Sequence, residues 1–102
     1  MIAGHIDVEQ EQLAEFCRRH GVRRLLLFGS VLTERFTESS DIDVLVEFQP
    51  GVRVGFLRMA AMERELSGLF GARKVDLRTP NELSPYFRDE VLQTAQVQYA
   101  AG

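Results

Sequence analysis

The chain has 102 residues, of which 45% are hydrophobic and 26% are charged; these proportions exclude collagen-like, coiled-coil and disordered proteins and predict a single domain over residues 1–102. Twelve Lys and Arg residues against fifteen Asp and Glu give a net charge of −3, so nucleic acid is not expected as a main partner. The lone Cys17 excludes an internal disulfide, and without a secretory signal or a long apolar run we expect a cytoplasmic protein with no membrane-spanning segment.

A helix followed by a buried strand is predicted for the N-terminal part of the chain. Asp7 and Gln10 have the spacing of a helix N-cap and its partner, and Gly21 is typical of a helix end, so we expect a helix at about residues 7–20. Residues 23–28 are two arginines followed by a short apolar run that stops at a glycine, which favours a buried strand over a helix.

A second strand is predicted at residues 42–48, after a polar connection, because this run is rich in β-branched residues and ends at a Pro-Gly turn. Side chains alternate along a strand, so the run has two faces. One face would carry Ile42, Val44, Val46 and Phe48, and the other Asp41, Asp43, Leu45 and Glu47.

The second half of the chain predicts a helix, a short strand and a final helix. Apolar residues at three-and-four spacing indicate a helix at about residues 54–70, and residues 74–77 indicate a strand. Ser84 followed by Pro85 predicts an N-cap and the first residue of the last helix. Its apolar stripe would be Phe87, Val91, Ala95 and Tyr99. We therefore expect an α/β fold of the two-layer α+β kind, with a small mixed three-stranded sheet covered by helices.

The turn after the first predicted strand is the first candidate for chemistry. Gly29 lets a phosphate approach the backbone closely, and the amides that follow it, with the Ser30 hydroxyl, could hold an anion. Most Gly-Ser turns after strands are only turns, so this feature alone does not distinguish a phosphate site from a connection.

Two carboxylates near the start of the second predicted strand are the second candidate. Asp41 and Asp43 are two residues apart, which would place their Cα atoms about 6.5 Å apart on one face, close enough to bridge divalent cations. Alternatively, Asp41 begins the strand as a turn residue and Asp43 faces solvent. Aspartate is depleted in strands, so Asp43 inside an apolar run favours a cationic partner, a metal or water beside it.

Asp76 repeats this pattern in the third predicted strand. Its simplest interpretation is a salt bridge to one of the neighbouring cations Arg73, Lys74 and Arg78. Three strand carboxylates together with a Gly-Ser turn, however, are the components of a metal-dependent phosphoryl-transfer site.

The remaining reactive side chains read as structural. Cys17 lies in the apolar stripe of the first helix and is expected to pack in the core. His5 and His20 have no partner at metal-ligand spacing, so a surface or helix-end role is expected for each.

The segment 27–48, with Leu-Phe-Gly-Ser at its start and Ser-Asp-Ile-Asp-Val-Leu-Val-Glu-Phe at its end, resembles the signature of the minimal nucleotidyltransferases in the DNA polymerase β superfamily. The later Lys-Val-Asp-Leu of residues 74–77 resembles the third carboxylate motif of that superfamily, so the resemblance covers nearly the whole chain. Many relatives carry Arg-Ala-Arg-Gly directly after Gly-Ser, whereas residues 31–34 are Val-Leu-Thr-Glu here, which removes two arginines that could touch phosphate.

The resemblance implies a nucleotidyltransferase fold and a Mg²⁺-dependent enzyme, with two metal ions, that transfers AMP from ATP to a macromolecular hydroxyl. Gly29 and Ser30 would hold the β- and γ-phosphates, and Asp41 with Asp43 would coordinate Mg²⁺. Asp76 would bind the metal nearest the acceptor and help to deprotonate its hydroxyl.

Family members of this size often lie beside a HEPN-type ribonuclease toxin, so the resemblance implies an antitoxin that adenylylates such a partner. The alternative is a non-catalytic interaction module that neutralises its partner by binding, which the altered residues 31–34 favour. Nucleotidylation of a small molecule shares the motif but normally needs an added domain for the acceptor. Homo-oligomerisation and base preference are left open.

Overall fold

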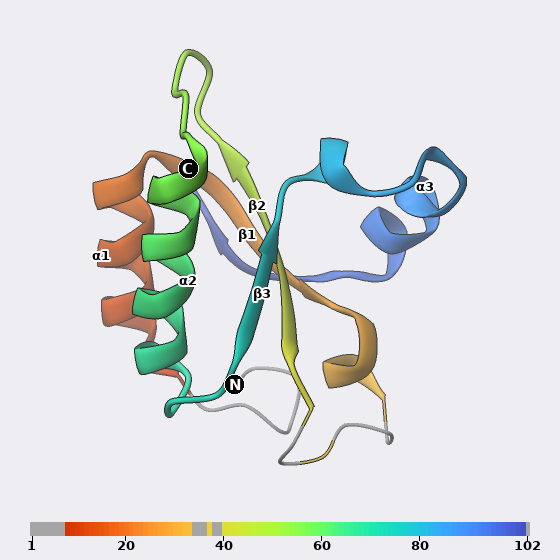
Figure 1. The fold of residues 1–102 in the computed structure, drawn as a ribbon, viewed down its shortest axis with the longest axis horizontal. Helices are drawn as coiled ribbons and strands as arrows, with labels where there is room; N and C mark the ends of the chain where they lie inside the picture. The colour runs from red at the N-terminus through yellow and green to blue at the C-terminus, as the bar shows by residue number, and fades with distance from the viewer. Residues whose placement is uncertain (1–7, 34–36, 38–39, 102) are drawn as a thin grey trace.

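The computed structural model describes residues 8–33, 37 and 40–101 and confirms an α+β fold (Figure 1). The described residues form three α-helices, two short 3₁₀ turns and one four-stranded sheet. In chain order the elements are α1 (Gln10–His20), β1 (Val22–Phe28), η1 (Gly29–Leu32), β2 (Ile42–Phe48), α2 (Phe56–Leu69), β3 (Val75–Arg78), η2 (Pro80–Glu82), α3 (Pro85–Thr94) and β4 (Gln96–Ala100).

The sheet is mixed, as expected, with the strand order β3-β2-β1-β4. β1 runs antiparallel to both β2 and β4, whereas β2 and β3 are parallel and are connected through α2. A parallel pair needs such a crossover because its strands begin at the same edge of the sheet. β2 and β3 therefore start beside one another, with Ile42 opposite Val75.

The fourth strand corrects the predicted three-stranded sheet and the end of the predicted last helix. α3 ends at Thr94, and Gln96–Ala100 pairs with β1 as the edge strand β4. Tyr99 is thus part of a strand opposite Leu25 and packs against the core instead of extending a helical stripe. The physical reason is that polar and apolar residues alternate in this segment, as in a strand. Pairing with β1 then supplies hydrogen-bond partners to the backbone groups at the otherwise free edge of β1.

The main core lies between the sheet and the helices α1 and α2, which cover the same face of the sheet (Figure 1). It contains Leu13, Phe16, Cys17, Val22, Leu25, Leu27, Val31, Ile42, Val44, Val46, Met62, Leu66, Phe70, Val75 and Leu77. α3 lies on the opposite side of the sheet from this helix layer (Figure 1). The alternating faces of β2 agree with the prediction, although Leu45 on the second face is also fully buried.

The helix ends agree with the sequence signals only in part. Gly21 ends α1 in the left-handed conformation with φ +68°, as expected. α1 begins at Gln10 and not at residue 7; Glu9 is its N-cap and makes no side-chain capping bond, while Asp7 lies outside the described residues. The predicted cap of α3 is confirmed, because the Ser84 hydroxyl accepts a hydrogen bond from the Tyr86 amide.

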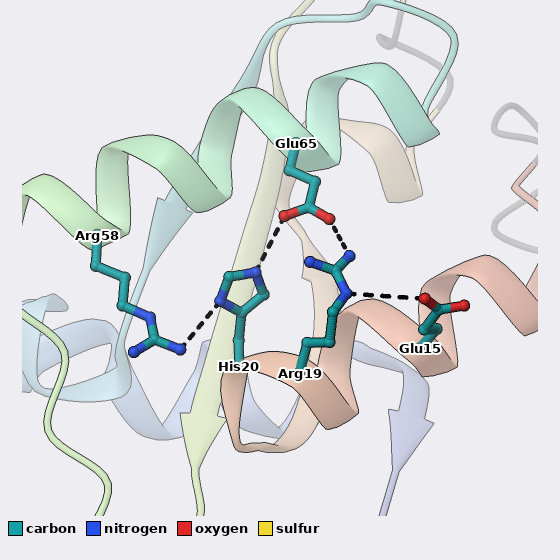
Figure 2. A network of polar contacts seen from close by, with 5 residues as sticks. All are labelled: Glu15, Arg19, His20, Arg58 and Glu65. Carbon is teal, nitrogen blue, oxygen red and sulfur yellow. Dashed lines mark hydrogen bonds and ion pairs between the residues drawn. The ribbon is translucent and has the colours of Figure 1, made fainter.

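A polar network joins α1 to α2 on the helix layer (Figure 2). Glu65 on α2 accepts hydrogen bonds from Arg19 and, at 3.0 Å, from His20 Nε2. Both bonds lower the pKa of Glu65, and the bond from Arg19 has the larger effect. Arg58 donates to the other ring nitrogen of His20 at 3.4 Å, so the imidazole bridges the two helices at the end of α1. His20 therefore has the helix-end role that was expected, whereas His5 lies outside the described residues.

Cys17 is fully buried in the core, and burial raises the pKa of its thiol to about 12. A thiol with this pKa is not a nucleophile at neutral pH, which confirms the packing role. Within the described part of the chain, no helix is both long and apolar enough to cross a membrane.

Candidate active site

The Gly-Ser turn and the second carboxylate meet at one end of the β1–β2 pair. Phe28 lies opposite Asp43 in the antiparallel register, so Gly29, the next residue, stands directly beside the Asp43 side chain. Gly29 has φ +77°, and a Cβ at this position would collide with Asp43 Oδ2 and lie 3.2 Å from Asp43 Cγ. Both the backbone conformation and the space therefore require glycine.

Of the three predicted carboxylates, Asp43 and Asp76 lie side by side on adjacent strands. They are direct neighbours in the parallel register of β2 and β3, where adjacent strands are about 4.8 Å apart, and both are half-buried. Burial raises the pKa of the Asp43 carboxyl above its usual value, the negative charge of Asp76 raises it further, and Arg78 opposes both. The pair is thus a concentration of negative charge that a cation would stabilise.

Asp41 stands at the rim of this site. β2 begins at Ile42, so Asp41 precedes the strand; its side chain is exposed, with Lys74 Nζ 3.8 Å from its Oδ2. The charge of Asp41 also raises the pKa of Asp43, although less than that of Asp76. Among residues 8–33, 37 and 40–101, no three His, Cys, Asp or Glu side chains are gathered as a ready-made metal site.

The geometry nevertheless fits a divalent cation that arrives with a phosphate ligand. Mg²⁺ is commonly held by one or two protein carboxylates together with substrate phosphates and water, and a protein cage is not needed. Asp43 and Asp76 supply two such carboxylates side by side, and Gly29 opens the backbone next to one of them.

The salt bridge that was considered for Asp76 is present, and its partner is Arg78. Arg78 Nη2 and Nε donate to the same oxygen, Asp76 Oδ2, at 3.1 and 3.3 Å. Both side chains are partly exposed, so this ion pair adds little to stability by itself. The ion pair matters for the site because it engages Asp76, one of the two neighbouring carboxylates.

Arg73, which the sequence suggests only as a possible partner of Asp76, instead holds the backbone before Asp41. Its guanidinium donates to the backbone oxygen of Thr37 at 2.6 Å and to that of Ser40 at 3.4 Å, just before Asp41. The Ile42 amide also donates to the backbone oxygen of Lys74 at 2.8 Å. These bonds fasten the start of β2 to the start of β3. A basic residue before a strand gives no sequence signal for such a contact.

A cleft of about 640 Å³ opens between η1 and α3, beside the Gly-Ser turn. Phe28, Gly29 and Leu32 line one side, and Phe87 and Val91 of α3 line the other. This volume lies in the range of small-molecule sites, and the wall is mostly apolar. The sequence predicts Phe87 only as part of a helical stripe and gives no sign of this cleft, because only the tertiary fold brings α3 against η1.

Two of the predicted features lie outside what the structure describes. The backbone of Ser30 belongs to η1, but its side chain, which was expected to bind phosphate, is outside the described part. Glu34 and Arg35, which follow the turn in the sequence, lie outside the described residues altogether.

Comparison with known proteins places this arrangement in a family. Residues 9–97 match the model of the nucleotidyltransferase domain. A protein of Methanocaldococcus jannaschii that is named as a protein adenylyltransferase is 38% identical over 91 residues, covering 89% of this chain and 95% of that protein.

Solved structures show the same fold. A minimal nucleotidyltransferase is 37% identical, with a TM-score of 0.68 over 84% of this chain and 85% of that one. A toxin–antitoxin structure with AMP-PNP aligns with a TM-score of 0.71 at 17% identity, covering 92% of this chain and 75% of that one. A complex of a tri-AMPylated Shewanella oneidensis HEPN toxin with its MNT antitoxin aligns with a TM-score of 0.63 at 17% identity, covering 90% and 70%.

Proposed function

Because this chain belongs to the nucleotidyltransferase domain family, we propose that it is an enzyme that transfers AMP from ATP to a hydroxyl group of a protein partner. The observation that carries the proposal is the meeting of Gly29 with Asp43, beside Asp76. A turn that can accept phosphate and two adjacent carboxylates are what a metal-dependent transfer of a nucleotidyl group needs at one point.

Each group has a role that follows from its place. The amides at the start of η1 would hold the β- and γ-phosphates, together with Ser30, and Asp43 with Asp76 would hold the metal, with Asp41 at the rim. Mg²⁺, when bound there, would neutralise charge on the triphosphate and polarise the α-phosphorus.

The chemical step is an in-line displacement. The acceptor oxygen forms a bond to the α-phosphorus, the bond to the β-phosphate oxygen breaks, and pyrophosphate leaves. The Asp76 carboxylate lies on the side of Asp43 away from Gly29 and would accept the proton of the acceptor hydroxyl. Most of the rate acceleration would come from positioning and charge neutralisation.

The cleft beside Gly29 is the place for the nucleoside. Phe28 and Phe87 both line this cleft and are the kind of side chain against which a flat base stacks, and Gln96 adds a polar group at the wall. A base in this cleft leaves its phosphates next to Gly29 and Asp43, which is the order that the transfer requires.

The proposed acceptor is a HEPN-type ribonuclease toxin, for which this chain would act as an antitoxin. Support comes from the fold shared with the two toxin–antitoxin structures, one with AMP-PNP and the other with a tri-AMPylated toxin. The protein adenylyltransferase of M. jannaschii, with more than a third of its residues identical, supports a protein acceptor.

The test is transfer of label from α-labelled ATP with Mg²⁺ to the product of the neighbouring reading frame. We expect labelled partner with the native protein and none with Asp43→Asn. Glu11→Gln, which also removes one negative charge but lies on the exposed face of α1, should label normally. No label with the native protein, or equal label with Asp43→Asn, would contradict the proposal.

A non-catalytic interaction module is the second candidate, and residues 31–34 favour it because they lack the arginines that could touch phosphate. Titration with ATP and Mg²⁺ separates the two. Metal-dependent ATP binding that Asp43→Asn abolishes supports the enzyme, and absence of ATP binding supports the module.

A further inference from the structure

Two cations flank the third carboxylate on one face of β3. Val75 and Leu77 point into the core, so Asp76 and Arg78 share the opposite face, and Lys74, just before the strand, alternates onto that face as well. This is the face that Asp43 presents on the neighbouring strand. The site therefore has its own positive charges, close to the carboxylates.

Each of these two cations pairs with one carboxylate of the site. Arg78 makes both of its bonds to Asp76 Oδ2, at 3.1 and 3.3 Å, and Lys74 Nζ lies 3.8 Å from Asp41 Oδ2. Asp43 stands between the two pairs, with its pKa raised by burial and by Asp76. Among the described residues, three carboxylates and two cations therefore alternate at this site, and the charge of Glu82 also acts on Arg78.

This arrangement affects a free metal ion and a metal–nucleotide complex in opposite ways. A free divalent cation must compete with Arg78 for Asp76 and is repelled by both flanking cations. A nucleoside triphosphate with one bound metal ion still carries a net negative charge, so the same cations attract it. Charge pairs at an exposed surface are weak as stabilisers but still direct which ligand binds.

Building on the proposed function, we propose that Arg78 is a specificity-determining positioning residue. It holds Asp76 while the site is empty of metal, is released when the metal of a metal–triphosphate complex takes that carboxylate, and then binds the phosphate oxygens of the substrate. The site thereby discriminates against free divalent cations and in favour of the metal–nucleotide complex.

The test compares two affinities in Arg78→Gln, both measured by calorimetry. Mn²⁺ alone should bind about 3- to 10-fold more tightly than to the native protein, because a competing positive charge is gone. α,β-Methylene-ATP with saturating Mg²⁺ should bind about 3- to 10-fold more weakly, because a cation that contacts phosphate is gone. A purely structural role would weaken both affinities together.

Two further variants make the test specific. Arg78→Lys keeps the positive charge, so both affinities should stay within about threefold of the native values. Arg64→Gln removes an exposed arginine from α2, on the other face of the sheet, and should change neither affinity. Circular dichroism establishes that each variant is folded.

The outcomes separate this inference from the function on which it rests. If the native protein binds neither Mn²⁺ nor the nucleotide analogue, the proposed function and this inference both fail. If the native protein binds both, but Arg78→Gln leaves the affinities unchanged or shifts them in the same direction, only the role of Arg78 is refuted. If Arg78→Gln does not fold, Arg78→Lys must still bind both ligands nearly as the native protein does.

Discussion

Replacing Gly29 by alanine should separate the stability of the fold from the function of the site. Because residue 29 has φ +77°, alanine there should lower the free energy of unfolding by about 1–2 kcal/mol through the backbone conformation alone. The new Cβ would also collide with Asp43 Oδ2 and sit 3.2 Å from Asp43 Cγ. The carboxylate is the end of a side chain that can rotate, so the collision should displace Asp43 more than it unfolds the protein.

Gly51→Ala is the matched control for this change. Gly51 has φ +86°, and a Cβ there meets nothing within 4 Å, so this variant measures the backbone contribution alone. In thermal melts both variants should lose about 4–8 °C for each kcal/mol of destabilisation, with Gly29→Ala losing somewhat more. Transfer of AMP should be normal for Gly51→Ala and lower by at least about 100-fold for Gly29→Ala, because the Asp43 carboxylate is displaced by an ångström or more.

A double-mutant cycle checks the cause. When Asp43 is also replaced by alanine, the loss from Gly29→Ala should shrink to the loss from Gly51→Ala, because the colliding carboxylate is gone. A collision between residue 29 and Asp43 is refuted if Gly29→Ala melts like Gly51→Ala and transfers AMP within a few-fold of the native rate. It is also refuted if removing Asp43 leaves the Gly29→Ala loss of stability unchanged.

Three further outcomes can be tested together. Asp43→Asn should raise the melting temperature at pH 7 in metal-free buffer, because the folded pKa of Asp43 is raised and a carboxyl of this kind loses stabilisation as pH increases through that pKa. The gain should vanish below pH ~4, the ordinary pKa of the carboxyl. Glu47 should show the opposite pH dependence, because its pKa is lowered, chiefly by the hydrogen bond from Arg24 at 2.6 Å. Glu47→Gln should lower the free energy of unfolding by about 1 kcal/mol at pH 7, and urea titrations should show this difference disappearing as pH falls through the folded pKa. Phe87→Ala should weaken ATP binding about 3- to 10-fold in calorimetry, whereas the adjacent Tyr86→Ala, which is exposed and does not line the cleft, should not.

The sequence predicts most of the fold because the local pattern and the final environment agree. β1 and β2 are apolar runs whose buried residues lie in the core, and α2 at Phe56–Leu69 falls within the predicted residues 54–70. The parallel β2–β3 pair agrees with the longest of the strand connections, which has room for the crossover helix α2. These elements need no knowledge of distant partners.

The last part of the chain is different, because two periodicities compete there. Phe87, Val91, Ala95 and Tyr99 recur every four residues, as in a helix, while the residues of β4 also alternate with a period of two. The local pattern does not decide between them. The free edge of β1 does, since pairing Tyr99 opposite Leu25 adds strand hydrogen bonds and buries an aromatic ring.

The candidate site shows the same division between local and distant information. Gly29, Asp43 and Asp76 are identifiable because each departs from what its local structure prefers: a glycine that closes a strand and aspartates inside strands. The cleft wall at Phe87 and the bonds of Arg73 are not identifiable, because they depend on how α3 and the start of β3 pack against segments far away in sequence. Arg78 was one of three candidates for Asp76, and only the structure distinguishes among them.

The core itself sets the geometry of the site. Val44 is buried against the helix layer between Asp43 and Leu45, so a slip of β2 by one residue would turn Asp43 toward the apolar core and expose Val44. The register that buries Val44 is also the one that places Asp43 opposite Phe28 and beside Asp76. The hydrophobic alternation of β2 therefore holds the carboxylate next to the glycine turn, and substitutions that weaken this alternation should impair transfer before they unfold the chain.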